Sequence, residues 1–270
     1  MAIRHSLQAN GIPIGGKLPI SQKVVVGIPV ASPPTWALHD SIMTLKTPKG
    51  FTELRAGTPD RPLPISDARN ALVEGLLALP EYGWMLQIDQ DAILHPETLM
   101  RLMSWDVPII SPLVFARYPP IVPVAFSKRR PDLGPNEYTV EIDEIRHWIG
   151  THKEMWKSTP VVLEPLPHDA LIHREFVGTH CLLVRRDVFE TIEPPWFKRV
   201  TEPGHQATGS DRYFSQKAIA AGFPIYMDRS VVAGHMYGRR SLGALDFLAW
   251  DAITDWTNKT WVIGGKDHGE

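Results

Sequence analysis

The sequence has very little cysteine and no long apolar run. Cys181 is the single cysteine among 270 residues, so an internal disulfide and a zinc site built from several cysteines are both excluded. This scarcity fits a reducing cytoplasm, which is the location we expect. Nowhere do eighteen apolar residues follow one another, and the first twenty residues contain glycine and proline in place of an apolar signal region. We therefore expect no membrane span and no targeting segment.

The chain also lacks a strong excess of charge of either sign. Its formal net charge is -2, so no whole-molecule field exists that would hold nucleic acid or an anionic membrane. Residues 128–130, Lys-Arg-Arg, form a local basic run. We interpret this run as a solvated loop, with contact to phosphates of DNA or of a lipid carrier as the alternative. Because 43% of the residues are hydrophobic and 21% are charged, the composition is that of a folded protein.

A chain of this length can bury one large core. We expect a single catalytic domain over residues 23–245, preceded by an N-terminal lead at 1–22 and followed by a tail at 246–270. The tail should pack on the domain, because it keeps four large aromatic residues. These are Phe247, Trp250, Trp256 and Trp261.

Strand and helix patterns alternate through the first 115 residues. Residues 23–30 and 84–88 are apolar runs without alternation, as expected of strands buried on both faces. Amphipathic helices are predicted near 36–46, after an N-cap at Ser66, and after Pro96 in a first turn. This alternation predicts an α/β fold in which helices flank a mainly parallel sheet.

The second half of the chain has a weaker pattern. Pro108 and Pro112 interrupt a further strand, so we expect it at an edge or at a bulge. Periodicity fades over residues 117–169, which we interpret as a loop-rich insert that serves recognition. A helix with Asp211 at its start follows, and Gly222 is expected just beyond its C-terminal end.

Two carboxylates follow the apolar run 84–88. A strand sends alternate side chains to one side, so Asp89 and Asp91 should face the same way while Gln90 faces the other. Two like charges at the end of a buried strand disfavour each other's ionisation unless a cation lies between them. Hard divalent ions bind carboxylate oxygens and fill their remaining positions with water and substrate phosphates. The stretch therefore indicates a seat for a metal-bound diphosphate.

The order of these parts resembles the GT-A nucleotide-sugar glycosyltransferases, especially their family 2-like members, from about residue 23 to residue 235. Residues 89–91 match the DxD motif of that family and follow the helical Ala68-Arg69-Asn70. Residues 178–189 resemble the glycine-rich segment before the acceptor-side helix, and residues 210–214 resemble the stretch with the catalytic carboxylate. His235 stands where some GT-A enzymes have a further metal ligand.

The resemblance implies a Rossmann-like GT-A domain that moves a sugar from a nucleoside-diphosphate sugar, such as a UDP- or GDP-sugar, to an acceptor hydroxyl. Inversion by single displacement is expected, with Asp211 as the base, kept ionised by its helix N-terminus. Asp91 and His235 would hold the metal, while Asp89 would share it or contact the ribose. Neutral imidazole suits Mn²⁺ better than Mg²⁺, so Mn²⁺ is the first choice.

The same resemblance assigns binding residues. Donor contacts are expected at Pro29, Val30, Ala31, Arg69, Asn70, Asp89, Gln90, Gly178 and Thr179. Candidate acceptor contacts are Arg117, Tyr118 and Trp196, although core packing explains Trp196 nearly as well. The acceptor stays open between a glycan, a small molecule, a lipid carrier and a nucleic-acid base.

The chain departs from the family pattern in three ways. Ser210 replaces the usual glutamate before Asp211, no Asp pair follows the second strand, and no Gln-x-x-Arg-Trp motif is present. The last absence argues against a processive polysaccharide synthase. The alternatives are a retaining transferase of the mannosylglycerate synthase type, an Asp-based phosphatase and a catalytically silent binding module. His173, His180 and His205 have no assigned role.

Overall fold

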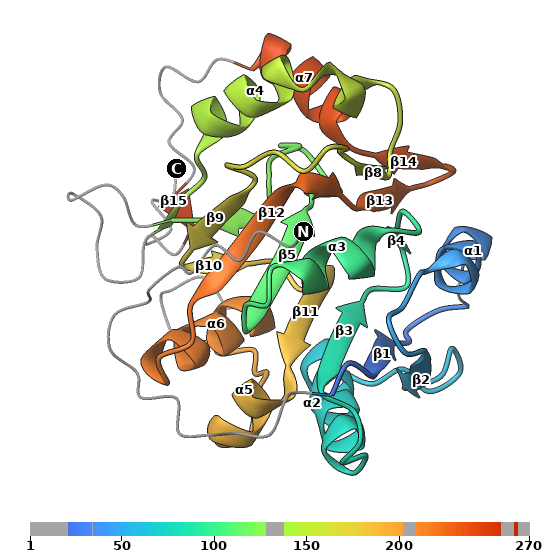
Figure 1. The fold of residues 1–270 in the computed structure, drawn as a ribbon. Helices are drawn as coiled ribbons and strands as arrows, with labels where there is room; N and C mark the ends of the chain where they lie inside the picture. Colours follow the sequence, from blue (N-terminus) through green and yellow to red (C-terminus); the bar gives the residue numbers. More distant parts are fainter. Residues whose placement is uncertain (1–20, 34, 128–137, 202–208, 255–261, 264–270) are drawn as a thin grey trace, which may run out of the picture.

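A mixed eight-stranded sheet runs through the middle of the molecule (Figure 1). The computed structural model describes residues 21–33, 35–127, 138–201, 209–254 and 262–263. The strand order is β2-β1-β3-β11-β5-β12-β8, and β9 also pairs with β12. The strands are β1 (Val24–Pro29), β2 (Phe51–Ala56), β3 (Trp84–Ile88), β5 (Ile109–Leu113), β8 (Val161–Val162), β9 (Leu171–Arg174), β11 (Cys181–Arg185) and β12 (Ile225–Val232).

Most strands of this sheet run in one direction. The pairs β1/β2, β1/β3 and β5/β12 are parallel, whereas β11 is antiparallel to β3 and β5, and β8 and β9 are antiparallel to β12. It follows that β2, β1, β3, β5 and β12 all run in one direction. The carboxyl ends of these strands therefore meet at one edge, where ligands collect in open α/β sheets.

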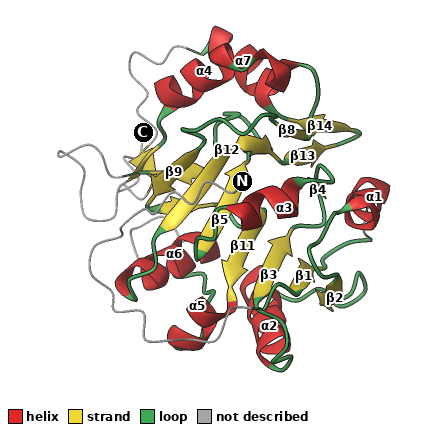
Figure 2. Cartoon of the chain, in the orientation of Figure 1, coloured by secondary structure: helices red, strands yellow, loops and turns green. Residues whose placement is uncertain are grey.

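Helices cover both faces of the sheet (Figure 2). Side chains of α2, α5 and α6 pack on one face and those of α1 and α3 on the other, and successive residues of β1 alternate between the two cores. The expected α/β fold with a mainly parallel, helix-flanked sheet is thus confirmed. The helices are α1 (Trp36–Thr44), α2 (Ile65–Leu77), α3 (Thr98–Ser104), α4 (Ile142–Thr151), α5 (Arg186–Thr191), α6 (Ser210–Ala220) and α7 (Ala244–Ile253), with a 3₁₀ turn at Lys153–Trp156.

A small three-stranded sheet of β4 (Ala92–Ile93), β13 (Gly234–Tyr237) and β14 (Arg240–Leu242) lies next to the edge where the carboxyl ends of the parallel strands meet. Two further pairs join β6 (Ala125–Phe126) to β10 (Phe176–Val177) and β7 (Tyr138–Thr139) to β15 (Val262–Ile263). The predicted insert holds β6, β7, β8 and α4 in addition to loops. In the described part of the tail, Phe247 is buried and stacks on Phe115 with ring centres 5.5 Å apart.

One local alternative is confirmed and one local prediction is corrected. The strand with Pro112 is β5, which lies between β11 and β12 and not at an edge; the bulge expected as the alternative is present, because the register of β12 shifts between Asp228 and Val232 beside it. Helix α2 begins at Ile65, directly after Pro64, so Ser66 lies inside the helix and does not cap it.

Some expectations concern parts of the chain that the structure does not describe. The basic run 128–130, His205, Trp256 and Trp261 lie outside the described residues, as do residues 1–20 of the N-terminal lead. In the ranges that are described, no helix has the length and the apolar character that a bilayer crossing requires.

Candidate functional site

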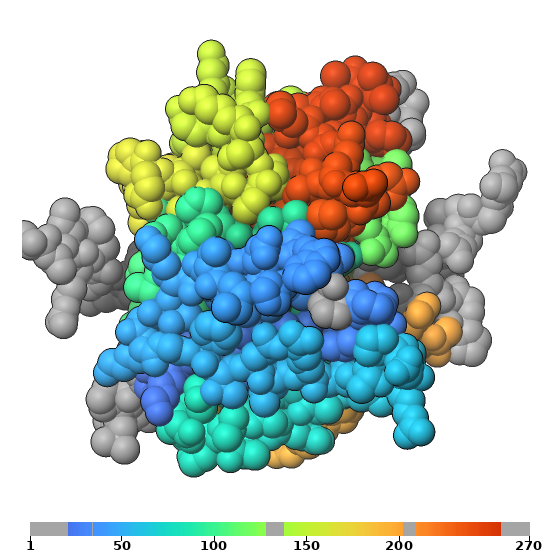
Figure 3. Space-filling model, turned by 90° about the vertical axis from the view of Figure 1, so that its right-hand side faces the viewer, coloured from blue at the N-terminus to red at the C-terminus, as the bar shows by residue number. Residues whose placement is uncertain are grey.

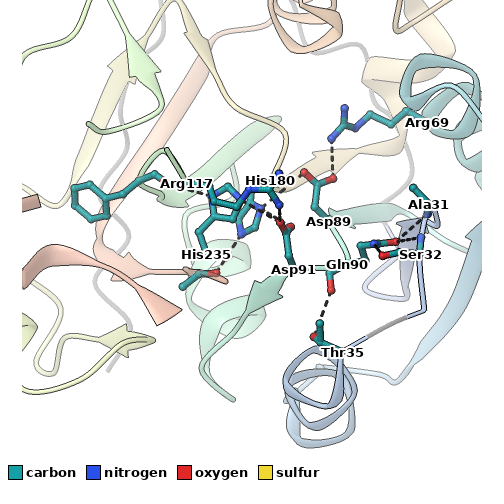
Figure 4. A network of polar contacts seen from close by, with 12 residues as sticks. Ala31, Ser32, Thr35, Arg69, Asp89, Gln90, Asp91, Arg117, His180 and His235 are labelled. Carbon is teal, nitrogen blue, oxygen red and sulfur yellow. Dashed lines mark hydrogen bonds and ion pairs between the residues drawn. The ribbon is translucent and has the colours of Figure 1, made fainter. Parts of the chain in front are cut away.

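Asp89, Gln90 and Asp91 leave the end of β3 with their side chains on alternate sides (Figure 4). The two carboxylates point away from Gln90. The strand ends at Ile88, however, and the N–H of Ala92 donates to the oxygen of Asp89 at 3.0 Å, so a turn and not the period of a strand sets these directions. Oε1 of Gln90 accepts hydrogen bonds from the backbone N–H groups of Ala31 and Ser32 at 2.9 and 3.1 Å. Gln90 therefore fixes the loop after β1 against the end of β3.

One carboxylate and two imidazoles converge on the other side. An oxygen of Asp91 and one ring nitrogen each of His180 and His235 all lie within 4.8 Å of one another. Nδ1 of His180 is 3.6 Å from Oδ1 of Asp91, and Nε2 of His235 is 3.3 Å from Oδ2. His180 immediately precedes β11, which pairs with β3, while His235 lies in β13, where it pairs with Ala92 of β4. Strand pairing thus assembles the cluster from three distant segments.

Backbone carbonyl groups fix the tautomers of both imidazoles. Nε2 of His180 donates to the oxygen of Gly234 at 3.1 Å, and Nδ1 of His235 donates to the oxygen of Phe115 at 3.0 Å. A carbonyl oxygen only accepts, so each of these nitrogens carries a proton, and in the neutral imidazole the other nitrogen presents a lone pair. Both lone pairs face Asp91. Nδ1 of His180 is buried and has no hydrogen-bond partner in the described part of the chain.

This donor set fits a divalent metal ion. Two imidazole lone pairs beside a carboxylate make an electron-rich pocket. Arg117 donates to Oδ2 of Asp91, but no donor among the described residues meets the lone pairs of the two rings, and a metal ion would accept them. Histidine ligands typically donate their second N–H to a carbonyl or carboxylate, as both do here. Burial raises the pKa of Asp91, but the attraction of His235 and His180, each in its protonated form, outweighs it and lowers that pKa. Asp91 therefore offers an ionised ligand.

A buried arginine holds Asp89 next to this cluster. Nη2 of Arg69, in α2, donates to Oδ1 of Asp89 at 2.7 Å, and Nη1 donates to Oγ of Ser210 at 3.3 Å. The side chain of Arg69 is only 6% exposed. Burial acts to raise the pKa of Asp89, yet attraction to Arg69 and to His180 lowers it from 3.8 to about 2. Oδ2 of Asp89 lies 3.8 Å from Nδ1 of His180, so this carboxylate borders the metal cluster.

Asp211 shares a cavity with these groups. The cavity has a volume of about 420 Å³, and its lining includes Asp89, His180, His235 and Asp211 together with Gly178 and Thr179. Asp211 lies in the first turn of α6, where Oδ1 accepts the N–H of Arg212 at 2.8 Å. A Cβ atom on Gly209, two residues earlier, would lie 2.4 Å from that oxygen, so a larger residue there would displace the Asp211 carboxylate.

The expected effect of the helix start on Asp211 is wrong. Burial raises the pKa of Asp211, and the backbone N–H of Arg212 and the charge of Arg69 offset this only in part. The helix N-terminus is present, but the loss of solvent around the carboxylate has the larger effect.

Of the remaining predicted residues, some lie near the metal cluster and others are buried elsewhere. Arg117 reaches the cluster, where Nη1 donates to Oδ2 of Asp91 at 2.6 Å, and the neighbouring Tyr118 is 60% exposed. Pro29 and Val30 are buried at the end of β1.

Asn70 and Trp196 do not line the cavity. Both amide atoms of Asn70 bond to the backbone of Phe197, at 2.8 and 2.9 Å. Trp196 is buried, and its Nε1 donates to the oxygen of Phe189 at 2.9 Å. Core packing, the alternative for Trp196, is what the structure shows.

Comparison with known proteins adds evidence on the fold. No described protein family and no curated protein matches the chain. The crystal structure of A197 from STIV covers 92% of this chain and 96% of its own, with 13% identity and a TM-score of 0.50. The structure of GalNAc-T7 with UDP, GalNAc and Mn2+ covers 81% of this chain and 43% of its own, with 12% identity and a TM-score of 0.48. At these identities a similarity shows the fold alone, so this chain shares its overall fold with A197.

Proposed function

We propose that the protein is a metal-dependent glycosyltransferase that moves a sugar from a nucleoside-diphosphate sugar, a UDP- or GDP-sugar, to an acceptor hydroxyl. One observation carries the proposal: ring nitrogens of His180 and His235 converge on Asp91, and both histidines line the cavity that also holds Asp211. A metal seat and a buried carboxylate in one cavity are the two parts that such a transfer needs. The arrangement of the sheet and the order of motifs agree with a GT-A domain.

Asp91, His180 and His235 would hold Mn²⁺, or Mg²⁺ as the second choice. When bound, the ion supplies positive charge that stabilises the negative charge on the departing diphosphate. Arg69 orients Asp89 toward the same cavity, which suits a contact to the ribose or to the ion. Asn70 is not assigned to the sugar donor, because both atoms of its amide bond to the backbone of Phe197. Its role is to hold α2 against that segment.

Asp211 would take the proton of the acceptor hydroxyl. Its pKa is raised by burial, and a base whose pKa lies closer to the working pH accepts a proton more readily than an ordinary carboxylate. With both histidines of the metal cluster and Asp211 lining the same cavity, the sugar would lie between leaving group and base. Such a geometry favours inversion by single displacement. Retention of configuration is the alternative, and NMR of the product linkage distinguishes the two.

Thermal unfolding in the presence of nucleotide-sugars tests the proposal. A UDP- or GDP-sugar with Mn²⁺ at about one hundred times its Kd should raise Tm by roughly 5 to 10 °C, because binding to the native state alone stabilises it. EDTA and the variant Asp91→Asn should abolish the shift. Asp40→Asn changes an aspartate of α1 whose side chain is 77% exposed and should leave the shift intact. A donor-induced shift that survives EDTA contradicts the metal-bound diphosphate.

Two observations separate the rival functions. A phosphatase that uses Asp-x-Asp should release phosphate from simple esters without a nucleotide-sugar, while a silent binding module should bind the donor and transfer nothing.

Two histidines with one carboxylate are also the donor set of non-haem Fe(II) oxygenases. Metal titration under anaerobic conditions, followed by an oxygen-consumption assay, distinguishes that chemistry from sugar transfer.

A further inference from the structure

A second cavity, of about 690 Å³, adjoins the metal centre. The segment after β5, the β13–β14 hairpin and α7 line this open cavity, and the red C-terminal segment that carries α7 lies above the blue N-terminal part of the chain in Figure 3. Arg117 links the two sites, because it lines this cavity and also donates to Asp91. Tyr237, also in the lining, is two residues beyond His235 on the same strand. A ligand here would therefore lie next to the metal-binding residues.

The cavity carries an excess of positive charge. Three arginines line it, against one carboxylate, that of Asp246. Arg117 pairs with Asp91 and Arg240 pairs with Asp246, whereas Arg239 is exposed and makes no hydrogen bond or ion pair within the described ranges. The guanidinium group presents a planar fork of N–H donors that matches the oxygens of a phosphate. Arg239 is thus an unused anion-binding group at the rim.

The rest of the lining is apolar or aromatic. Ile121, Leu242, Ala249 and Trp250 form one part of the wall, and Ile253 is left 77% exposed. Tyr237, at 49% exposure, adds an aromatic face. Large apolar side chains that stay exposed around a concave surface mark a binding site more often than bare surface. The ligand should therefore combine an anionic group with an apolar or aromatic one.

We propose that this cavity binds a phosphate ester with an apolar or aromatic group, with Arg239 as the residue that recognises the phosphate. Two sources share this chemistry: the nucleoside diphosphate of the donor, and an acceptor that is itself phosphorylated. Assigning the ligand to the transfer reaction rests on the proposed function; the phosphate-binding role of the cavity does not.

Isothermal titration calorimetry tests the proposal with phenyl phosphate, inorganic phosphate, phenol, UDP and GDP as probes. Phenyl phosphate should bind the wild-type protein more tightly than inorganic phosphate or phenol, because it alone engages both parts of the cavity. Arg239→Gln should weaken the binding of phosphate esters about tenfold, since it removes a charge-assisted hydrogen bond. The control Arg61→Gln changes an exposed arginine in the turn after β2 and should bind every probe as the wild type does.

The probes also identify the source. If Arg239→Gln weakens the binding of UDP or GDP in the presence of Mn²⁺, the cavity binds the sugar donor. If the variant weakens the binding of phenyl phosphate alone, the cavity binds a phosphorylated acceptor. Affinities equal to those of Arg61→Gln for all anionic probes overturn the proposal. If the affinity for phenyl phosphate depends on Arg239 but no nucleotide-sugar binds the wild type, the proposed function is wrong and the phosphate site is still supported.

Discussion

Nε2 of His180 donates a hydrogen bond to the carbonyl oxygen of Gly234 across 3.1 Å, and the next residue along the chain is His235. One histidine of the cluster therefore holds the strand that carries the other. The ring of His235 is held in turn by a hydrogen bond from its Nδ1 to the carbonyl oxygen of Phe115, in the segment after β5. Both rings are oriented by the protein itself, so their lone pairs are preorganised for a ligand.

His180→Gln should weaken Mn²⁺ binding by at least about 100-fold. A glutamine amide is similar in length and still able to donate to the Gly234 oxygen, but it provides no imidazole lone pair. Loss of a residue that merely orients a ligand already reduces metal affinity about 10- to 100-fold, and loss of a ligand should cost more. Calorimetric titration with Mn²⁺ measures this. His173→Gln, which alters an exposed histidine of β9, serves as the control; equal affinities in the two variants would remove His180 from the metal site.

Gly234→Ala should distort the site through the backbone. A Cβ atom at this position would lie 2.1 Å from Oγ of Ser241, 3.1 Å from Cγ2 of Thr159 and 3.2 Å from Cβ of Ile93. Strand β13 must shift to relieve these contacts, and His235 shifts with it. We expect a lower Tm and weaker Mn²⁺ binding, with partial recovery in Gly234→Ala combined with Ser241→Ala, which removes the closest atom.

Gly150→Ala provides the matched control for that series. No atom lies within 4 Å of a Cβ added to Gly150, which is in α4. Alanine is favoured over glycine in a helix by about 1 kcal/mol, so this variant should raise Tm by about 2 to 4 °C with unchanged Mn²⁺ affinity. If both glycine variants lower Tm alike, the steric explanation for Gly234 is wrong.

The sequence predicts the parts of the fold that local patterns determine. Apolar runs identify β1 and β3 because both are buried on both faces. The common side of Asp89 and Asp91 is also predicted, but from a strand pattern, whereas the structure places these residues in a turn after Ile88. The helix that begins near Asp211 and ends before Gly222 is likewise marked by its end residues, and Gly222 has a φ of +85°. These features depend on neighbours in the chain.

Features that depend on tertiary contacts are not predictable in this way. His180 reaches the metal site because β11 runs antiparallel to β3, which pairs Cys181 with Ile88 and brings His180 beside Asp89. No spacing in the sequence marks this pairing. The same reason applies to Asp211, whose pKa is raised by burial that only the packed structure reveals.

Asp228 should make stability depend on pH. This carboxylate is fully buried in β12 and accepts hydrogen bonds from Ser230 and from Nε1 of Trp105. Burial raises its pKa above 3.8, and these bonds offset the rise only in part. The folded state therefore holds the proton at pH values where the unfolded state has lost it. Stability from this group is full below about pH 3.8 and is lost as the pH rises through the folded-state pKa.

Urea unfolding from pH 4 to pH 8 measures this effect through Asp228→Asn, which cannot titrate. The free energy of unfolding of the wild type should fall relative to that of the variant as the pH rises, and then level off. The control Asp106→Asn changes an exposed aspartate with a positive φ of 50°, which asparagine also adopts, and should show a constant difference. A wild type that gains stability relative to Asp228→Asn with rising pH contradicts the assignment.

Asp211→Asn should separate catalysis from binding. An amide keeps the shape of the side chain and accepts the N–H of Arg212, but it cannot take a proton, so kcat should fall by about 10²- to 10⁴-fold while donor affinity with Mn²⁺ stays within a factor of about three. Removing a buried charge whose pKa is raised should also make the variant at least as stable as the wild type at neutral pH. Asp67→Asn alters the corresponding exposed aspartate in the first turn of α2 and should retain full turnover. Equal turnover in the two variants would exclude Asp211 as the base, and a loss of donor affinity in Asp211→Asn would assign it to binding instead.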